Sequence, residues 1–200
     1  MGPGRAHTHR FTLGGSKDGD LSHYRLEVLV DSGAYARLGA FLPMFTLPMT
    51  VGVYDIPNVE NNAITVVTNT TPTEAYRGAG RPEATLTVER AVELWALKAG
   101  LDPIDVRRKN FLAPDSFPAT TGVGTVYDSG EYERSLDLAL QAADYEELKK
   151  EQEERRRSGS TKQLGIGVAT YVEVTAGPAP GGSEYGKVEI TPEGKAKVYS

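Results

Sequence analysis

The sequence predicts an α+β fold, in which antiparallel or mixed sheets pack against helices. Two patterns lead to this prediction. Polar and apolar residues alternate in the N-terminal part, as in strands with one buried face, whereas apolar residues recur at helical spacing between residues 84 and 99. Of the 200 residues, 39% are apolar and 24% are charged, so the chain can bury a sizeable core in one or two domains.

The first predicted element is an antiparallel hairpin. Thr8–Leu13 and Tyr24–Val30 alternate in polarity, and Lys17–Asp20 between them has the composition of a turn. In the second strand the residues around Leu26 form an apolar face, so we expect the sheet to be covered on that side.

Two histidines, His7 and His9, share a face of the first strand. Such a pair can begin a metal site, but the sequence shows no third ligand nearby. We therefore expect both to be solvent-exposed strand residues.

Ala36–Val53 is apolar but is interrupted by prolines and glycines, so it cannot form a regular helix or a central strand. We predict a buried, irregular wall with a short helical turn, followed by a turn and a strand at Ala63–Thr68. Four large side chains of the wall either belong to the core, which we favour, or line a substrate channel: Phe41, Met44, Phe45 and Met49.

Two helices are predicted next. The first begins near Pro82 and ends at Gly100, with an apolar stripe at Ala84, Val88, Ala91, Trp95 and Ala99 that we assign to the core. Asp102 and Pro103 then form a cap and a helix start, so a short second helix is expected through Asn110. Its basic residues, Arg107, Arg108 and Lys109, are expected on a solvated face.

The C-terminal part begins with a predicted linker, Ala113–Gly130, which is rich in proline, glycine, serine and threonine. An amphipathic helix at Glu131–Ala143 and an exposed, charged helix from Asp144 to Arg157 follow. Three ion pairs are expected along the charged helix: Glu146 with Lys150, Glu151 with Arg155, and Glu153 with Arg157. Strands are predicted at Gly165–Thr175, Glu184–Thr191 and Lys195–Ser200, with a loop at Ala176–Ser183.

Composition excludes several classes of function. The net charge is -5 and the isoelectric point is near 5.3, which argues against nucleic acid as the main partner. The sequence has no cysteine, so it supplies no disulfide, thiol nucleophile or iron–sulfur ligand. It also shows neither a signal peptide nor a membrane span. We therefore expect a cytoplasmic protein.

The segment that leads into the first predicted helix is the best candidate for binding a ligand. Gly78 and Gly80 allow backbone conformations closed to other residues and permit close approach of another molecule. Arg77 and Arg81 flank them with permanent positive charges, and Pro82 marks a helix start, where N–H groups attract anions. A purely structural turn before a helix would have a similar sequence. The residues alone leave both interpretations open.

Several motifs in this order resemble the molybdopterin-binding large subunit of the xanthine dehydrogenase, aldehyde oxidase and carbon monoxide dehydrogenase family. They are YDIPN at 54–58, VTNTTP at 67–72, AYRGAGRPEA at 75–84, RRKNF at 107–111, YDSG at 127–130 and GIGVATYVEV at 165–174. The resemblance implies a molybdenum hydroxylase that acts on a small molecule through a molybdenum–molybdopterin cofactor, in the cytosine dinucleotide form. It also implies an iron–sulfur small subunit and an FAD-binding medium subunit as partners.

By the same resemblance, the cofactor-binding residues would be Tyr76, Arg77, Gly78, Ala79 and Gly80. Xanthine-type members have an aromatic residue where this chain has Ala79, and copper-containing carbon monoxide dehydrogenases have a cysteine where it has Gly78. A substrate arginine of the xanthine enzymes, expected around Phe45, is also missing. The loop therefore resembles the type II members, and neither a purine nor carbon monoxide is favoured as substrate.

Members of the family are several times longer, and their catalytic glutamate lies outside this chain. We therefore expect an internal fragment that is inactive alone. Residues 1–125 would form the C-terminal part of the first cofactor-binding domain and residues 126–200 the N-terminal part of the second. The alternative is a non-catalytic remnant or interaction module that pairs with another chain.

Overall fold

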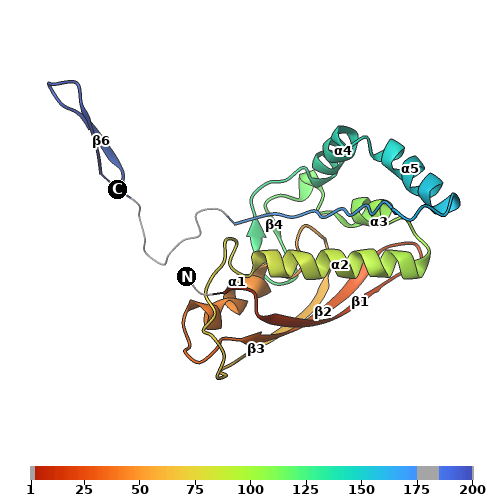
Figure 1. Ribbon diagram of the computed structural model, residues 1–200, viewed down its shortest axis with the longest axis horizontal. Helices are drawn as coiled ribbons and strands as arrows, with labels where there is room; N and C mark the ends of the chain where they lie inside the picture. The colour runs from red at the N-terminus through yellow and green to blue at the C-terminus, as the bar shows by residue number, and fades with distance from the viewer. Residues whose placement is uncertain (1–2, 175–184, 200) are drawn as a thin grey trace.

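The computed structural model describes residues 3–174 and 185–199, and its centre is a three-stranded sheet (Figure 1). β1 (His7–Gly15) and β2 (Leu21–Asp31) form the predicted antiparallel hairpin. β3 (Asn58–Val66) pairs with β2 in parallel, which makes the sheet mixed, with β2 in the middle. β3 begins earlier than predicted, because its polar first half completes the pairing with β2. The α+β fold class is confirmed.

The segment between β2 and β3 is an irregular wall, as predicted. It contains η1 (Leu38–Phe41), α1 (Pro43–Thr46) and η2 (Leu47–Met49). The core assignment holds for Met49, which is buried, but is wrong for Phe41 and Met44, whose exposed fractions are 54% and 67%. The short turns of this wall follow its prolines, and alternate side chains of such turns face away from the core.

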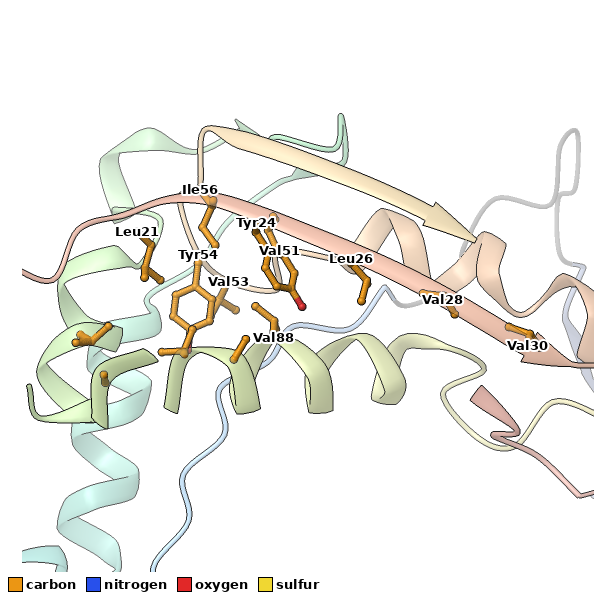
Figure 2. Close-up of a cluster of buried hydrophobic side chains, with 14 residues drawn as sticks. Leu21, Tyr24, Leu26, Val28, Val30, Val51, Val53, Tyr54, Ile56 and Val88 are labelled. Carbon is orange, nitrogen blue, oxygen red and sulfur yellow. The ribbon is translucent and has the colours of Figure 1, made fainter. Parts of the chain in front are cut away.

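α2 (Arg81–Ala99) covers one face of the sheet. It ends at Gly100, whose φ of 76° forms the left-handed C-terminal cap. Figure 2 shows Tyr24, Leu26 and Val28 directed from β2 toward the helix, which presents Val88. The predicted sheet face is therefore the covered one. The fully buried core contains Leu26, Val30, Val51, Val53, Val88, Val92 and Ala96.

α3 (Pro103–Asn110) is capped as predicted, because the Asp102 side chain accepts a hydrogen bond from the Ile104 N–H at 2.7 Å. The predicted linker that follows contains η3 (Pro114–Ser116) and a small pair of strands, β4 (Ala119–Thr120) and β5 (Val126–Tyr127). It packs on the core, and the Tyr127 hydroxyl donates to the Gly52 carbonyl at 2.8 Å.

α4 (Tyr132–Ala142) and α5 (Tyr145–Arg157) confirm the two predicted helices, and α5 buries no residue. Of the three predicted ion pairs only Glu151 with Arg155 forms. Lys150 and Arg157 instead pair with carboxylates three residues earlier, Glu147 and Glu154. Both spacings place side chains on neighbouring positions of a helix surface, so the choice between them depends on rotamers.

Residues 164–174 form an extended segment, here called the strap, which runs beside α2 and α3 (Figure 1). The strand predicted for this stretch is wrong for the described residues 165–174, because no other strand pairs with them. The alternation that suggested a strand reflects side chains that face the helices, such as Ile166 and Val168. Residue 175 and the predicted loop at 176–183 lie outside the described residues.

β6 (Lys187–Ile190) and β7 (Ala196–Tyr199) form an antiparallel hairpin, within the bounds predicted for the last two strands. Glu184 and Ser200, at the ends of those bounds, are not among the described residues. The apolar side chains of the hairpin are solvent-exposed, including Val188, Ile190 and Val198. No helix in the described part of the chain is long and apolar enough to cross a membrane.

Candidate cofactor site

The arginine loop, residues 69–80, starts at the edge of the sheet where β2 and β3 both end. Asp31 closes this edge: its carboxylate accepts hydrogen bonds from the Thr68 hydroxyl at 2.7 Å, the Gly33 N–H at 2.8 Å and the Thr70 hydroxyl at 3.1 Å. These bonds, with that of Thr68 first, lower the pKa of Asp31. The beginning of the loop is thereby fixed to the end of β2.

The middle of the loop lies against the wall. Thr73 is buried; its N–H donates to the Ser32 carbonyl at 3.1 Å, and its hydroxyl donates to the Asp31 carbonyl at 3.2 Å. A Cβ atom added to Gly39 would lie 2.1 Å from the Thr73 hydroxyl oxygen. Only glycine therefore allows η1 to approach the loop this closely.

The bend at the end of the loop consists of three consecutive residues with positive φ: Gly78 at 94°, Ala79 at 44° and Gly80 at 89°. A Cβ atom on Gly78 would lie 2.4 Å from the Pro82 ring, and one on Gly80 would lie 2.5 Å from the Leu42 carbonyl oxygen. The close approach that the two glycines allow is therefore made by the chain itself. For Gly78 and Gly80, the interpretation as a structural turn before a helix is therefore supported.

At the end of the arginine loop, some backbone N–H groups and the Arg77 side chain have no hydrogen-bond partner in the described part of the chain. The Ala79 N–H donates to the Tyr76 carbonyl at 2.7 Å and the Arg81 N–H to the Gly78 carbonyl at 3.2 Å. The N–H groups of Arg77, Gly78 and Gly80 donate to no acceptor among residues 3–174 and 185–199. Arg77 is exposed, and its guanidinium has no partner within those same residues. This set of cationic and N–H donors suits an oxyanion.

Two further arginines lie beside the loop, and both are paired. Arg81 forms an ion pair with Glu173 of the strap at 2.9 Å and lies 5.0 Å from the centre of the Phe45 ring. Arg5 forms an ion pair with Glu83 at 3.1 Å. Sequence reasoning missed Arg5, because no local pattern links it to a loop more than seventy residues later.

His7 and His9 are half-buried, so the prediction of solvated histidines is wrong. Nδ1 of His9 lies 2.5 Å from the Thr87 hydroxyl, and Nε2 of His9 lies 3.3 Å from Nδ1 of His7. Both rings lie between β1 and α2, and burial lowers both pKa values; that of His9 falls to about 4, with the neighbouring His7 contributing. No group of three possible metal-ligating side chains was found in the described part of the chain.

A second charged cluster surrounds Arg107, whose side chain is 1% exposed. Nε donates to Glu89 at 2.9 Å, Nη1 to Glu93 at 3.2 Å, and Nη2 to the Val168 carbonyl of the strap at 3.0 Å. Burial acts most strongly and lowers the pKa of Arg107, but attraction to Glu89 and Tyr54 and the hydrogen bonds to Glu89 and Glu93 together outweigh it, and the pKa is raised. The expected solvated face is therefore wrong for this residue, and its partners indicate a structural role.

The Arg107 cluster extends to Tyr54 and Thr170. The Tyr54 hydroxyl lies 2.5 Å and the Thr170 hydroxyl 2.9 Å from the same oxygen of Glu89. Burial, with the nearby Glu89, raises the pKa of Tyr54 far above its ordinary value. Tyr54 therefore stays protonated and donates to Glu89. The cluster joins the wall, α2, α3 and the strap.

Two segments of the chain match the sequence profile of the molybdopterin cofactor-binding domain: residues 1–111 and residues 138–200. The carbon monoxide dehydrogenase large chain of Hydrogenophaga pseudoflava is 36% identical over 84% of this chain and 22% of its own length. The nicotine 6-hydroxylase large subunit of Paenarthrobacter nicotinovorans is 34% identical over 78% of this chain and 19% of its own.

Solved structures of related proteins are also similar to this chain. Quinoline 2-oxidoreductase from Pseudomonas putida 86 superposes with a TM-score of 0.85 at 28% identity, over 98% of this chain and 26% of that protein. The reconstituted CO dehydrogenase from Oligotropha carboxidovorans gives a TM-score of 0.68 at 32% identity, over 79% of this chain and 20% of that one. The chain thus spans about a quarter or less of the length of these relatives. Because the first profile alone covers more than half of its residues, the chain belongs to the molybdopterin cofactor-binding family of molybdenum hydroxylase large subunits.

Proposed function

We propose that this chain contributes the arginine loop to the cofactor site of a molybdenum hydroxylase large subunit. The observation that supports this most directly is the set of donors at the bend, where the exposed Arg77 guanidinium and neighbouring N–H groups have no partner among the described residues. In a member of a molybdopterin-binding family, such donors suit the oxyanionic groups of the cofactor. When bound, the cofactor would supply the oxidation–reduction chemistry.

The chain's own residues would bind and orient the cofactor. Arg77 would supply a permanent positive charge, and the N–H groups of Arg77 and Gly78 would supply short-range donors beside it. α2 starts immediately after the bend, so its dipole adds positive potential at the same place. Tyr76, whose side chain is 62% exposed, and Ala79 would border the bound group.

The further assignments rest on the resemblance and the relatives. We infer the cytosine dinucleotide form of molybdopterin, and iron–sulfur and FAD cofactors on partner subunits. Several relatives are named as large chains or subunits, which supports a complex, and the lack of cysteine in this sequence is compatible with clusters on another chain. The separate profile matches at 1–111 and 138–200 support a domain division near residue 125.

We propose a small molecule as the substrate and the cytoplasm as the location of the complex. The alternative, an interaction module without catalysis, has support from the β6–β7 hairpin. Its apolar side chains Val188, Ile190 and Val198 are 65% to 72% exposed. A two-stranded hairpin is marginally stable in water, so it needs another surface to pack on.

The experiment is the Arg77→Ala substitution in the complete large subunit, purified with its partner subunits. Because the variant loses the unpaired charge at the bend, we expect molybdenum content per complex, measured by mass spectrometry, to fall by about tenfold. Arg10→Ala is the matched control, since Arg10 is an exposed arginine on β1 away from the loop. Wild-type molybdenum content and turnover in the Arg77 variant would refute the assignment.

A further inference from the structure

Arg5 contacts the end of the arginine loop and the start of α2. Its Nη2 donates to the Arg77 carbonyl at 2.9 Å, its Nε lies 3.1 Å from Glu83, and its guanidinium carbon lies 4.5 Å from the centre of the Tyr76 ring. One planar group therefore contacts two consecutive loop residues and the first turn of α2. Only the planar, multiply donating guanidinium can make all three contacts together.

The backbone before Arg5 supports the same contact. The Glu74 N–H donates to the Pro3 carbonyl at 2.9 Å, and a Cβ atom added to Gly4 would lie 2.8 Å from Cβ of Tyr76. The N-terminal segment thus lies directly along the loop. Arg5 itself has a φ of 64°, an uncommon value for a residue with a side chain. The surrounding contacts keep the residue in this unfavourable conformation.

Glu83 provides a rigid anchor for Arg5. Its side chain is 8% exposed, and it lies in the first turn of α2, where the helix dipole stabilises a carboxylate. One carboxylate oxygen pairs with Arg5, while the other, Oε2, is buried without a hydrogen-bond partner in the described structure. A buried carboxylate needs a charged partner, so the Arg5–Glu83 pair is costly to separate.

We propose that Arg5 is a positioning residue, which fixes the backbone at Arg77 relative to the start of α2 and so presents the Arg77 side chain to an anionic ligand. This inference rests on the proposed function of the arginine loop. The loop has three consecutive residues with positive φ, and the Arg5 side chain joins the Arg77 carbonyl just before them to the first turn of α2 just after them. Arg5 does not itself need to touch the ligand.

The test uses the complete complex with Arg5→Ala, Arg5→Lys and the control Arg10→Ala. Hydrogen exchange, measured on complex prepared without cofactor, reports on the loop independently of ligand binding. For Arg5→Ala we expect faster exchange in residues 76–80, carried by the Ala79 amide, which donates to the Tyr76 carbonyl and is the one amide of these five with an acceptor in the described structure. It should exchange about tenfold faster, because a charged hydrogen bond that steadies the neighbouring Arg77 carbonyl is lost. Exchange in β1, β2 and the second half of α2 should stay unchanged, which separates loop positioning from general destabilisation.

Arg5→Lys keeps the charge next to Glu83 but loses the planar group, so we expect an intermediate exchange rate at residues 76–80. If Arg5→Ala does not fold, Arg5→Lys alone tests the proposal. In cofactor-loaded complex, molybdenum content should fall in the order wild type, Arg5→Lys, Arg5→Ala. Wild-type exchange at residues 76–80 in both variants would overturn the proposal.

The outcome of Arg77→Ala distinguishes this inference from the proposed function. In one outcome, Arg77→Ala retains molybdenum while Arg5→Ala speeds exchange in the loop. The proposed function then fails. The positioning role of Arg5 is overturned as well, because Arg5 would only support the structure of the loop. If Arg77→Ala loses molybdenum and Arg5→Ala changes neither exchange nor molybdenum content, the proposed function stands and the inference about Arg5 is refuted.

Discussion

Arg107 joins three parts of the molecule: α2, its own helix α3 and the strap. It donates to two carboxylates of α2, to a carbonyl of α3 and to a carbonyl of the strap. Neighbouring Arg108 instead lies at the surface, where it pairs with Glu133 and Asp137 of α4. Two adjacent arginines thus both pair with carboxylates, but the Arg107–Glu89 pair is buried and the Arg108–Asp137 pair lies near the surface.

Arg107→Ala should therefore be severely destabilising. Removal of one partner leaves Glu89, which is 5% exposed, buried without its charge partner, and such changes cost about 3–5 kcal/mol. Arg108→Ala is the matched control and should cost about 1 kcal/mol or less, because its pairs are partly solvated. Urea unfolding of both variants measures the difference. Equal loss of unfolding free energy in the two would contradict the structural role of Arg107.

The histidine pair makes stability depend on pH. The pKa of His9 is about 4 in the folded state, against about 6.5 when unfolded, so the unfolded chain binds more protons between these values. Stability is therefore complete above about pH 6.5 and is lost as the pH falls toward 4. We expect a loss of about 1 kcal/mol between pH 7 and pH 5, discounted for partial solvent contact.

His9→Gln should flatten this dependence, because glutamine can still hydrogen-bond to Thr87 but does not titrate. His23→Gln serves as the matched control, since His23 is an exposed histidine on β2. Urea midpoints measured from pH 7 to pH 5 test the difference. An unchanged slope in the His9 variant would show that His9 is not the titrating group.

At the scale of elements, the local patterns predicted the helices α2, α3, α4 and α5 but misjudged the strap. The strap alternates between half-buried and exposed side chains, as a strand does, yet its buried side faces α2 and α3. Alternation reports which side of an extended chain is buried, and it says nothing of whether another strand lies alongside. A strand assignment needs that second partner, which a single sequence does not reveal.

The bend at the start of α2 should depend on Gly80 for two reasons, its positive φ and its contact with the wall. Gly100 at the other end of α2 has a similar φ, but an added Cβ there would meet nothing within 4 Å. Gly100→Ala should thus cost about 1 kcal/mol, from backbone strain alone. Gly80→Ala should cost about 1–3 kcal/mol more, because its Cβ would lie 2.5 Å from the Leu42 carbonyl oxygen. Thermal unfolding of the two variants checks the difference, and equal losses would contradict the contact.

At the scale of the whole molecule, the sequence predicted the features that depend on neighbouring residues and missed the contacts between distant segments. The β1–β2 hairpin, α2 with its glycine stop and the capped α3 depend on neighbouring residues, and the sequence predicted them. The parallel pairing of β3 with β2 and the approach of Arg5 to Arg77 join distant segments, and no local pattern indicated either. The burial of Arg107 had one usable signal: its spacing of three from Ile104 and Asn110, which are also buried.

The candidate site follows the same rule. The glycines and arginine of the loop were predicted from their own chemistry and from resemblance, and they remain predictions as ligand contacts. The finding that Gly78 and Gly80 accommodate Pro82 and Leu42 required the folded chain, because both contacts depend on how the wall and α2 are placed.

The parallel arrangement of β2 and β3 also bears on which parts of this protein can change length. Since both strands finish at the same edge, the residue pair Asp31 and Val66 sets the point from which the arginine loop departs. An insertion of one residue within β3 would advance that point by about 3.3 Å and turn each following side chain to the other face. The second and third strands must therefore keep their register. The turn between β1 and β2 has no such link to the loop. It is constrained for a different reason: Gly19 is buried, and its carbonyl accepts a hydrogen bond from the Asn110 side chain of α3 at 2.8 Å.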